Sequence, residues 1–296
     1  MNRTELLLND LEKHDKIVEI GPSHAPLAPK SRGWNSFSVD HATRDELIAK
    51  YNGMGVDTSL VEVVDFVWRG GSITEAIPQQ HHATFKAFIA SHVIEHSPDI
   101  IRFLLSAQHL LTEDGKIVLA LPDKRKSFDF YRPLSTTSDA LVAFYEQRSK
   151  HTAKTHFDNA AFACNRNGDA GWLETDTRPL AAASDLAGAR QHWNMADKPD
   201  YVDAHAWIFT PASFELMVIE ISELGHLDLR LERREENPTT EFYAWLRRGR
   251  LPSEQVQARR IELLNEIIVE LAEQARQIEG SKLWEAYQPH DGSSLL

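Results

Sequence analysis

The stretch that decides the fold is Lys16–Gly21, which reads KIVEIG and opens the loop GPSHAPLAPK. A short β-branched run that ends in an acid and a glycine predicts a buried parallel strand followed by a tight turn. A second predicted strand, Asn35–Asp40 (NSFSVD), ends in an acid 19 residues after Gly21. This arrangement is typical of a nucleoside pocket, because the turn lets the ligand approach the backbone and the acid accepts hydrogen bonds from ribose hydroxyls.

The loop after the first strand is poorly suited to phosphates. A dinucleotide fingerprint, G-x-G-x-x-G, needs three glycines, whereas Gly21 is followed by Pro22, Ser23 and His24. Pro22 has no N–H to donate, and a pyrophosphate requires several free amides at a helix N-terminus. We therefore expect a ligand without phosphates, and a nicotinamide-dependent dehydrogenase or epimerase is the least favoured class of enzyme.

The composition is that of an ordinary globular protein, with 296 residues, 42% hydrophobic and 26% charged. A net charge of −12 argues against a nucleic-acid partner, which needs a basic surface. No apolar run approaches the roughly 18 residues of a membrane span. The N-terminal stretch MNRTELLLNDLEKHDK is a poor signal peptide and predicts a helix that packs on the sheet. The one cysteine, Cys164, excludes an internal disulfide and suits a reducing compartment such as the cytoplasm.

Predicted strands and helices alternate through the first half of the chain. Thr43 begins a helix and has Glu46 three residues later, as in a capping box. The elements predicted after Asp40 are the helices Thr43–Asn52 and Ile100–Leu111 and the strands Val61–Trp68, Phe85–Ser91 and Lys116–Leu121. Alternation at this spacing predicts a parallel sheet with helices on both faces.

The order of elements changes near the end. The segment Thr210–Leu224 reads as a helix with Pro211 in its first turn. The predicted strands Leu227–Arg233 and Glu241–Arg247 follow it, and the short connection between them favours an antiparallel hairpin.

Four regions follow from this pattern. Residues 1–127 form a core, 128–206 an inserted acceptor-binding or lid region, 207–250 the completion of the core, and 251–296 a C-terminal amphipathic helix and tail. The insertion has little periodicity, and an excursion of that length usually serves binding. The apolar stripe of the tail consists of Leu264, Ile267, Ile268, Leu271, Ala275 and Ile278. It either packs on its own domain or forms an interface, including one between two copies of the chain.

Three segments carry a resemblance to a known family: KIVEIGP (16–22), FIASHVIEHSPD (88–99) and LLTEDGKIVLALPDKR (110–125). They resemble the motifs of class I methyltransferases that depend on S-adenosyl-L-methionine (SAM). Together with DAHAWIFTPASFE (203–215), they are similar to type 11-like bacterial methyltransferases found near glycosyltransferases. The resemblance implies an α/β, Rossmann-like sheet of five parallel strands plus a C-terminal antiparallel hairpin, with SAM as the cofactor.

The resemblance also assigns roles to individual residues. Gly21 lets the turn approach the methionine part of SAM, with Glu19 at the same strand end, and Asp40 holds the ribose hydroxyls. Ser91 and His92 lie under the sulfonium and face the acceptor. The implied cofactor-binding residues are Glu19, Gly21, Pro22, Ser23, Asp40, His41, Arg69, Gly70, Ser91 and His92. The family often places an acid near the end of the third strand, where this chain has Arg69-Gly70.

Catalysis of methyl transfer requires chiefly the alignment of donor and acceptor, because the sulfonium is already a strong electrophile. A hydroxyl acceptor, such as that of a sugar, a glycan or another small polar molecule, also needs a base. Imidazole suits this role near neutral pH. We expect His92 to be the base, with His156 or His205 from the insertion as the next choices.

Each of these residues also has a structural interpretation. Asp40 could cap the following helix, Glu95 and His96 could serve a helix N-terminus, and Asp123 and Lys124 could form a solvated turn. The aromatic residues of the insertion either line a sugar-binding floor or pack its interior; they are Trp172, Trp193, Tyr201 and Trp207.

Two further interpretations concern metals and activity. The polar residues of the insertion match no compact metal-ligand spacing, so no metal is expected. They are His151, His156, Asp158, His192, Asp203 and His205. Cys164 has no identifiable base partner and is not expected to act as a nucleophile. The alternative to an enzyme is a catalytically silent scaffold with the same fold, which acts through its C-terminal helix.

Overall fold

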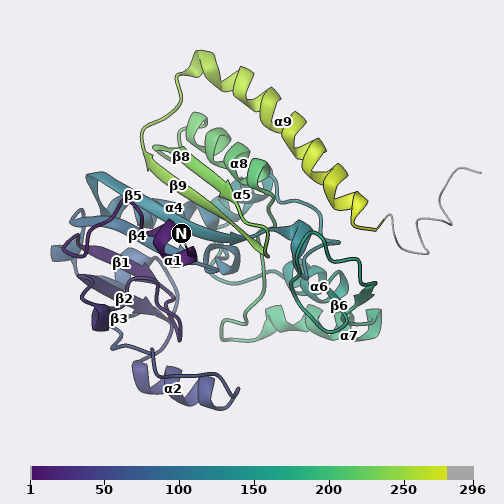
Figure 1. Ribbon diagram of the computed structural model, residues 1–296, viewed down its shortest axis with the longest axis horizontal. Helices are drawn as coiled ribbons and strands as arrows, with labels where there is room; N and C mark the ends of the chain where they lie inside the picture. Colours follow the sequence, from purple (N-terminus) through teal and green to yellow (C-terminus); the bar gives the residue numbers. More distant parts are fainter. Residues whose placement is uncertain (1, 279–296) are drawn as a thin grey trace, which may run out of the picture.

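A seven-stranded sheet lies at the centre of the computed structural model, which describes residues 2–278 (Figure 1). Its strand order is β3-β2-β1-β4-β5-β9-β8. The strands are β1 (Ile17–Ile20), β2 (Ser36–Asp40), β3 (Phe66–Val67), β4 (Phe85–Ser91), β5 (Leu111–Pro122), β8 (Leu229–Glu236) and β9 (Glu241–Arg248). The first five pair in parallel, whereas β9 runs antiparallel to both β5 and β8. The predicted α/β, Rossmann-like fold class is therefore confirmed.

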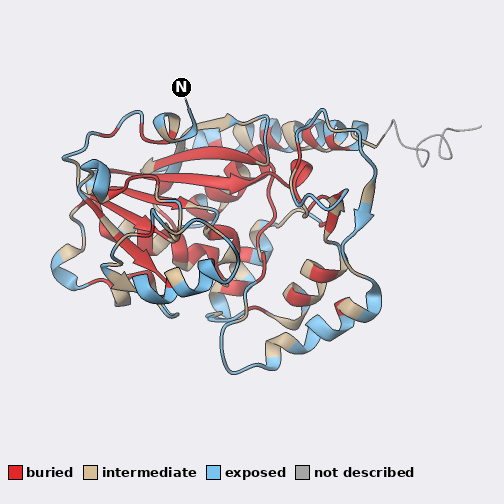
Figure 2. Cartoon of the chain, turned by 60° about the horizontal axis from the view of Figure 1, so that its bottom comes forward, coloured by how far each residue is buried: buried red, intermediate tan, exposed pale blue. Residues whose placement is uncertain are grey.

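Successive residues of a strand point to opposite faces of the sheet, so both faces of this sheet carry apolar side chains. Helices cover both faces. Val18 and Phe88 face a core built with α4 (Ile100–Leu110), α5 (Thr137–Tyr145) and α8 (Pro211–Glu223). Ile17 and Ile89 face a smaller core with Leu7 and Leu8, at the end of α1 (Arg3–Leu7). Figure 2 shows the strands buried between these layers. The N-terminal helix therefore packs on the sheet, as predicted.

The helices of the first half begin close to where the sequence places them. Thr43 is the N-cap of α2 (Arg44–Asn52) and forms a capping box with Glu46. Asp99 caps α4, and the short helix α3 (Ile73–Ala76) lies beside it. The predicted amphipathic helix over Ile100–Leu111 is thus confirmed to within one residue.

Two strand predictions need correction. The predicted strand Val61–Trp68 is reduced to the two residues of β3, because Val61 packs with Ala42 and Leu47 against α2 instead of pairing with β2. The fifth strand begins at Leu111 instead of the predicted Lys116, so residues 112–115 lie within β5, where the register with β4 shifts.

Besides α5, which packs on α4, the insertion contains α6 (Ala153–Ala161) and α7 (Leu186–Trp193), which pack on each other. It also contains a separate hairpin of β6 (Cys164–Arg166) and β7 (Leu180–Ala182). The chain returns to the core beside the loop after β4, where the Ala206 N–H donates to the Glu95 carbonyl over 2.7 Å. That return places insertion residues at the edge of the sheet.

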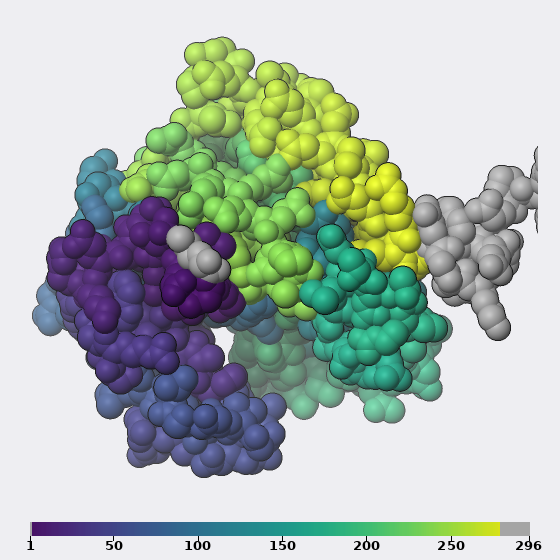
Figure 3. All heavy atoms as spheres, in the orientation of Figure 1, coloured from purple at the N-terminus to yellow at the C-terminus, as the bar shows by residue number. Residues whose placement is uncertain are grey.

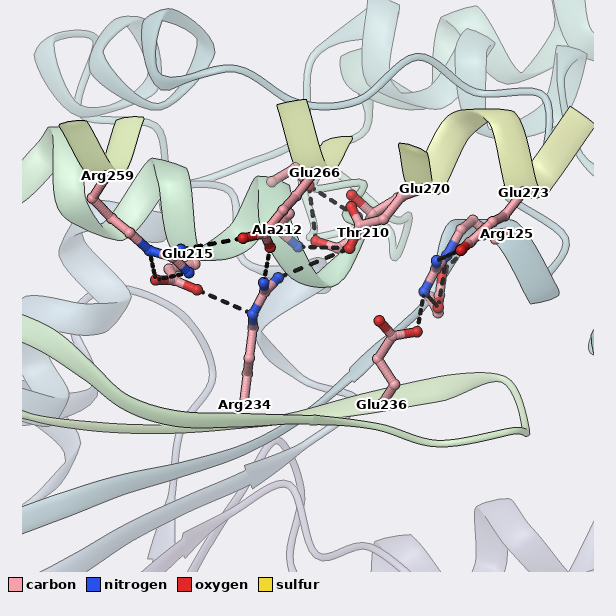
Figure 4. A network of polar contacts seen from close by, with 12 residues as sticks. Arg125, Thr210, Ala212, Glu215, Arg234, Glu236, Arg259, Glu266, Glu270 and Glu273 are labelled. Atoms are coloured by element: carbon pink, nitrogen blue, oxygen red, sulfur yellow. Dashed lines mark hydrogen bonds and ion pairs between the residues drawn. The ribbon is translucent and has the colours of Figure 1, made fainter. Parts of the chain in front are cut away.

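The last described helix, α9 (Ser253–Arg276), lies along α8 and ends against the insertion (Figure 3). Leu263 is buried against α8, while Ile268 of the predicted stripe is exposed. Figure 4 shows the ion pairs that hold the helix: Glu215 of α8 accepts from Arg259, and Arg125 pairs with Glu273 at 2.9 Å. The predicted tail beyond residue 278 lies outside the described residues. In the part that the structure describes, no helix has the length and apolarity needed to cross a bilayer.

Candidate functional site

The carboxyl ends of four parallel strands meet at one edge of the sheet. Ile20 of β1 pairs with Val39 of β2 on one side and with Ala90 of β4 on the other. Ser91 of β4 pairs with Ala120 of β5. The loop after β1, the tip of β2 and the loop after β4 are therefore neighbours, which is where open α/β sheets bind ligands.

The turn after β1 depends on Gly21 and Glu19. Gly21 has φ of +64°, and a β-carbon there would lie 2.8 Å from a methyl of Val93 in the loop after β4. The buried Glu19 carboxylate accepts from the Leu27 N–H at 2.7 Å and the Ala28 N–H at 3.1 Å. Burial raises the pKa of Glu19 to about 7, although the two amides act against this shift. Glu19 therefore holds the Leu27–Ala28 part of the loop through two buried hydrogen bonds.

The carboxylate of Asp40, at the end of β2, is bound by backbone N–H groups. Its side chain has 0% exposure, and it accepts from the Ser23 N–H at 2.9 Å and from the His41 N–H at 2.8 Å. The Nδ1 atom of His41 lies 2.6 Å from the same carboxylate. Thr43 caps α2, so the alternative role of Asp40 as a helix cap is wrong. Ser23 and His41, both predicted cofactor residues, contact the predicted ribose acid.

Three other predicted cofactor residues, Pro22, Arg69 and Gly70, have contacts or surroundings that do not involve the Asp40 carboxylate. Pro22 begins a turn in which its carbonyl accepts from the Ala25 N–H at 2.9 Å. Arg69, after β3, is exposed and binds both carboxylate oxygens of Glu46 on α2 at 3.0 Å. Gly70 beside it has φ of +126° and open space around its α-carbon. These positions stay predictions as cofactor contacts.

Ser91 and His92 lie in a cluster of charges at the end of β4. The Ser91 hydroxyl accepts from Arg3 at 2.7 Å. His92 has φ of +52°, and its Nε2 atom lies 2.9 Å from a carboxylate oxygen of Glu241, at the start of β9. Its Nδ1 atom lies 3.4 Å from Glu95. Arg3 binds the other Glu241 oxygen at 2.6 Å.

These contacts decide the protonation of His92. Burial lowers the pKa of His92, but the carboxylates of Glu241 and Glu95 outweigh burial and raise it to about 9. The pKa of Glu241 falls to about 2: burial alone would raise it, and Arg3 and His92 lower it. The His92 ring therefore already carries a proton at neutral pH, which argues against the expected role of His92 as a general base. Sequence reasoning missed Arg3 and Glu241, because they reach this edge only through α1 and the terminal hairpin.

A second polar cluster adjoins the first through Glu95. Glu95 is completely buried, and neither of its carboxylate oxygens accepts a hydrogen bond. The Nδ1 atom of His96 lies 2.8 Å from Asp203, and that of His205 lies 2.6 Å from Asp129. The two imidazole rings meet edge to face, with centroids 4.6 Å apart. Burial would raise the pKa of Glu95, yet the surrounding imidazoles hold it below its usual value.

The structure separates the three predicted catalytic histidines. His92 and His205 both lie around Glu95, whereas His156 is buried in α6 with its ring packed edge-on against His151. Burial lowers the pKa of both His151 and His156, that of His151 to about 4. Of the residues weighed as metal ligands, only His205 belongs to the group around Glu95, with Asp203 bound to His96.

The other candidates have structural partners. Asp123 and Lys124 are buried, with Asp123 holding Arg125 and Lys124 donating to Gln274 at 2.8 Å, so the solvated-turn interpretation is wrong. The Trp207 indole, one of the aromatic candidates of the insertion, donates to the Ser97 carbonyl at 2.6 Å. Trp172 packs on Phe130. Trp193 lies edge-on to Phe157, and the Tyr201 hydroxyl donates to the His96 carbonyl at 2.8 Å. Cys164 is buried, which raises its pKa to about 11.

Comparisons with known proteins give the following picture. Neither a protein-family model nor a curated protein matches the sequence. A protein from Rhodobacter sphaeroides proposed to be a Zn-dependent alcohol dehydrogenase is 13% identical over 83% of this chain and 88% of its own, with a TM-score of 0.46. The CcbJ methyltransferase from Streptomyces caelestis is 11% identical over 83% and 94% of the two chains, with a TM-score of 0.43. A protein from Listeria monocytogenes proposed to depend on S-adenosylmethionine is 8% identical over 83% and 96%, with a TM-score of 0.43. Similarities of this size do not bear on the activity.

Proposed function

We propose that this protein transfers a methyl group from SAM to a small polar acceptor, in the first place a hydroxyl of a sugar or glycan. The observation that carries the proposal is the pairing of the left-handed Gly21 turn with the buried Asp40 carboxylate at the tip of the adjacent strand. A nucleoside needs this combination of close backbone approach and an acid for its ribose. The loop motif, with Pro22 after Gly21, favours a nucleoside without a pyrophosphate.

Binding of the cofactor requires a local change around Asp40. Because the side chain has no exposed surface, a ribose hydroxyl reaches it only when the Ser23 segment moves aside. Glu19 holds the far end of the same loop through Leu27 and Ala28, so we expect movement to be confined to the segment near Ser23. The carboxylate would then exchange one backbone donor for ribose hydroxyls.

The acceptor is expected on the side of the insertion. A hollow between the insertion and the core is lined by Arg132, Arg148, Lys150 and His151, together with Trp207. Asp139 and Asp158 also line it, and a lining with charges of both signs beside an aromatic ring suits a hydroxylated molecule better than an apolar one. Among the predicted histidines, His205 is the better candidate to take the acceptor proton in the metal-free protein, because Asp129 holds its Nδ1 atom and Nε2 is the ring nitrogen that remains. An ion bound to this Nε2 atom would exclude that role.

The proposal is tested by incubating the protein with methyl-labelled SAM and a panel of sugars and sugar nucleotides. We expect transfer to at least one acceptor, and we expect His92→Ala to keep SAM affinity and lose most turnover, because Glu95 and Glu241 lose the cation between them. His14→Asn, which changes an exposed histidine, is the matched control. Unchanged turnover in His92→Ala would remove this residue from the mechanism.

The alternative, a catalytically silent scaffold, is favoured by one observation. Ile261, Ile268 and Val269 on α9 are exposed apolar residues, as an interface between two copies would require. A scaffold of this kind would bind SAM poorly and form stable assemblies. Sedimentation analysis beside the transfer assay distinguishes it from the enzyme.

A further inference from the structure

Three side chains from two distant segments of the sequence converge at the carboxyl edge of the sheet. Glu95 and His96 belong to the short helical turn after β4, and His205 belongs to the segment that leads the insertion back into α8. One ligand atom from each of the three lies within 4.8 Å of the other two. Two imidazoles and one carboxylate are a donor set that transition-metal ions bind in proteins.

Glu95 lacks the hydrogen bonds that a buried carboxylate normally has. Its side chain has 0% exposure, and neither oxygen accepts a hydrogen bond. The nearest nitrogens are His92 Nδ1 at 3.4 Å and His96 Nε2 at 3.9 Å. Glu95 therefore has imidazoles near it but no hydrogen bond, so the lone pairs of both buried oxygens are left without a partner and could bind a metal ion.

Both histidines are already oriented as metal-binding histidines are. The Nδ1 atom of His96 is held by Asp203, and that of His205 by Asp129. In metal sites, a carboxylate on one ring nitrogen typically fixes the tautomer and directs the other nitrogen to the ion. The His96 Nε2 atom lies 3.9 Å from Glu95, and in His205 the Nε2 atom is the ring nitrogen that Asp129 does not hold.

The backbone around the three residues is fixed from several sides. The Glu95 carbonyl accepts from the Ala206 N–H at 2.7 Å, and the Asn159 side chain accepts from the His205 N–H at 3.1 Å. The Tyr201 hydroxyl oxygen lies 2.8 Å from the His96 carbonyl and 3.0 Å from Asp203, and its one proton can be donated to either. The segments that carry the three side chains are therefore positioned by protein contacts alone.

We propose that Glu95, His96 and His205 bind one divalent transition-metal ion, for which zinc is the best match, with Asp203 and Asp129 as positioning residues. Zinc bonds to nitrogen and oxygen are about 2.0–2.2 Å, so a tetrahedral centre brings its ligand atoms to about 3.4 Å from one another. Side-chain rotation closes the larger separation seen here. Three protein ligands leave a fourth position for water or for an oxygen of a bound molecule. Magnesium is excluded on chemical grounds, because it prefers oxygen ligands.

The test uses the untagged full-length chain, freed of metal with a chelator and titrated with zinc chloride by calorimetry and with cobalt chloride by visible absorption. We expect one ion per chain and the intense visible bands of tetrahedral cobalt. Glu95→Gln and His205→Gln each weaken binding by at least about 100-fold, and Asp129→Asn weakens it by about 10- to 100-fold. Magnesium chloride gives no comparable binding.

The control is His192→Asn, which removes an exposed histidine of α7 and leaves affinity unchanged. Circular dichroism shows whether each variant is folded. If Glu95→Gln does not fold, the loss of metal affinity is measured with His205→Gln instead. Absence of binding by the folded wild-type protein overturns the proposal. Binding that both ligand variants retain, or that His192→Asn removes, overturns it as well. None of these readouts requires methyl transfer, so the outcome is independent of the proposed function.

Discussion

Glu19 and Glu95 are two buried carboxylates at the same edge of the sheet, at the ends of neighbouring strands, and their surroundings are opposite. Both oxygens of Glu19 accept backbone N–H groups of its own loop, whereas neither oxygen of Glu95 accepts a hydrogen bond. Burial raises the pKa of Glu19 to about 7, while imidazoles hold the pKa of Glu95 below its usual value despite its burial. Glu19 therefore closes the backbone of its own loop, whereas Glu95 stays charged among imidazoles.

The largest expected effect is on folding stability when Glu19 is removed. In Glu19→Ala, two buried amides lose their acceptor, and we expect the free energy of unfolding to fall by about 4 kcal/mol. The matched control is Glu62→Ala, which also frees two loop amides, those of Lys30 and Ser31, at a site that is only half-buried. Water replaces that acceptor, so we expect a loss of about 1 kcal/mol in urea unfolding. Equal losses in the two variants would contradict the role given to Glu19.

The pH dependence of stability comes next in size. Because the folded pKa of Glu19, about 7, lies above its ordinary value of 4.5, its contribution is fully present below about pH 4.5 and is lost as the pH rises through 7. The shift corresponds to about 3 kcal/mol. Urea unfolding at several pH values should show this loss in the wild type and not in Glu19→Gln. Parallel curves for the two proteins would refute the assignment.

A smaller effect is expected when Glu95 is neutralised. Glu95→Gln keeps the shape of the side chain and removes only ion pairs, and His92 retains Glu241 as a partner. We expect the metal-free protein to lose about 2 kcal/mol, which is less than in Glu19→Ala. Chemical unfolding in the presence of a chelator measures this difference. If the free energy of unfolding falls at least as much in Glu95→Gln as in Glu19→Ala, the proposed difference between Glu19 and Glu95 is wrong.

Most of the sheet was predictable, because its strands are short apolar runs bounded by turn residues. The strand expected over Val61–Trp68 was too long for a reason that periodicity does not contain. The Asp65 carboxylate accepts the Ser38 N–H, and Glu62 binds the loop amides of Lys30 and Ser31. These acids connect the β-branched stretch to β2 and to the loop of Lys30 and Ser31.

The site was predictable in part. Gly21 and Asp40 could be found from their spacing, because both lie at the ends of adjacent strands. The protonation of His92 could not, since Glu241 is 149 residues away and reaches it only through the antiparallel hairpin. The grouping of Glu95 and His96 with His205 likewise depends on where the insertion re-enters the core, which no local pattern encodes.

The proposed function requires the edge around Gly21 and Asp40 to bind the nucleoside of SAM. The most direct test is calorimetric titration with S-adenosylhomocysteine of the wild type, of Asp40→Ala, and of Asp45→Ala as a control that removes a 96% exposed acid on α2. We predict micromolar binding by the wild type and Asp45→Ala, and a loss of about 100-fold in Asp40→Ala, because the ribose loses a charged acceptor. Absence of binding by the folded wild type, or equal binding by Asp40→Ala, would contradict the account and favour the scaffold.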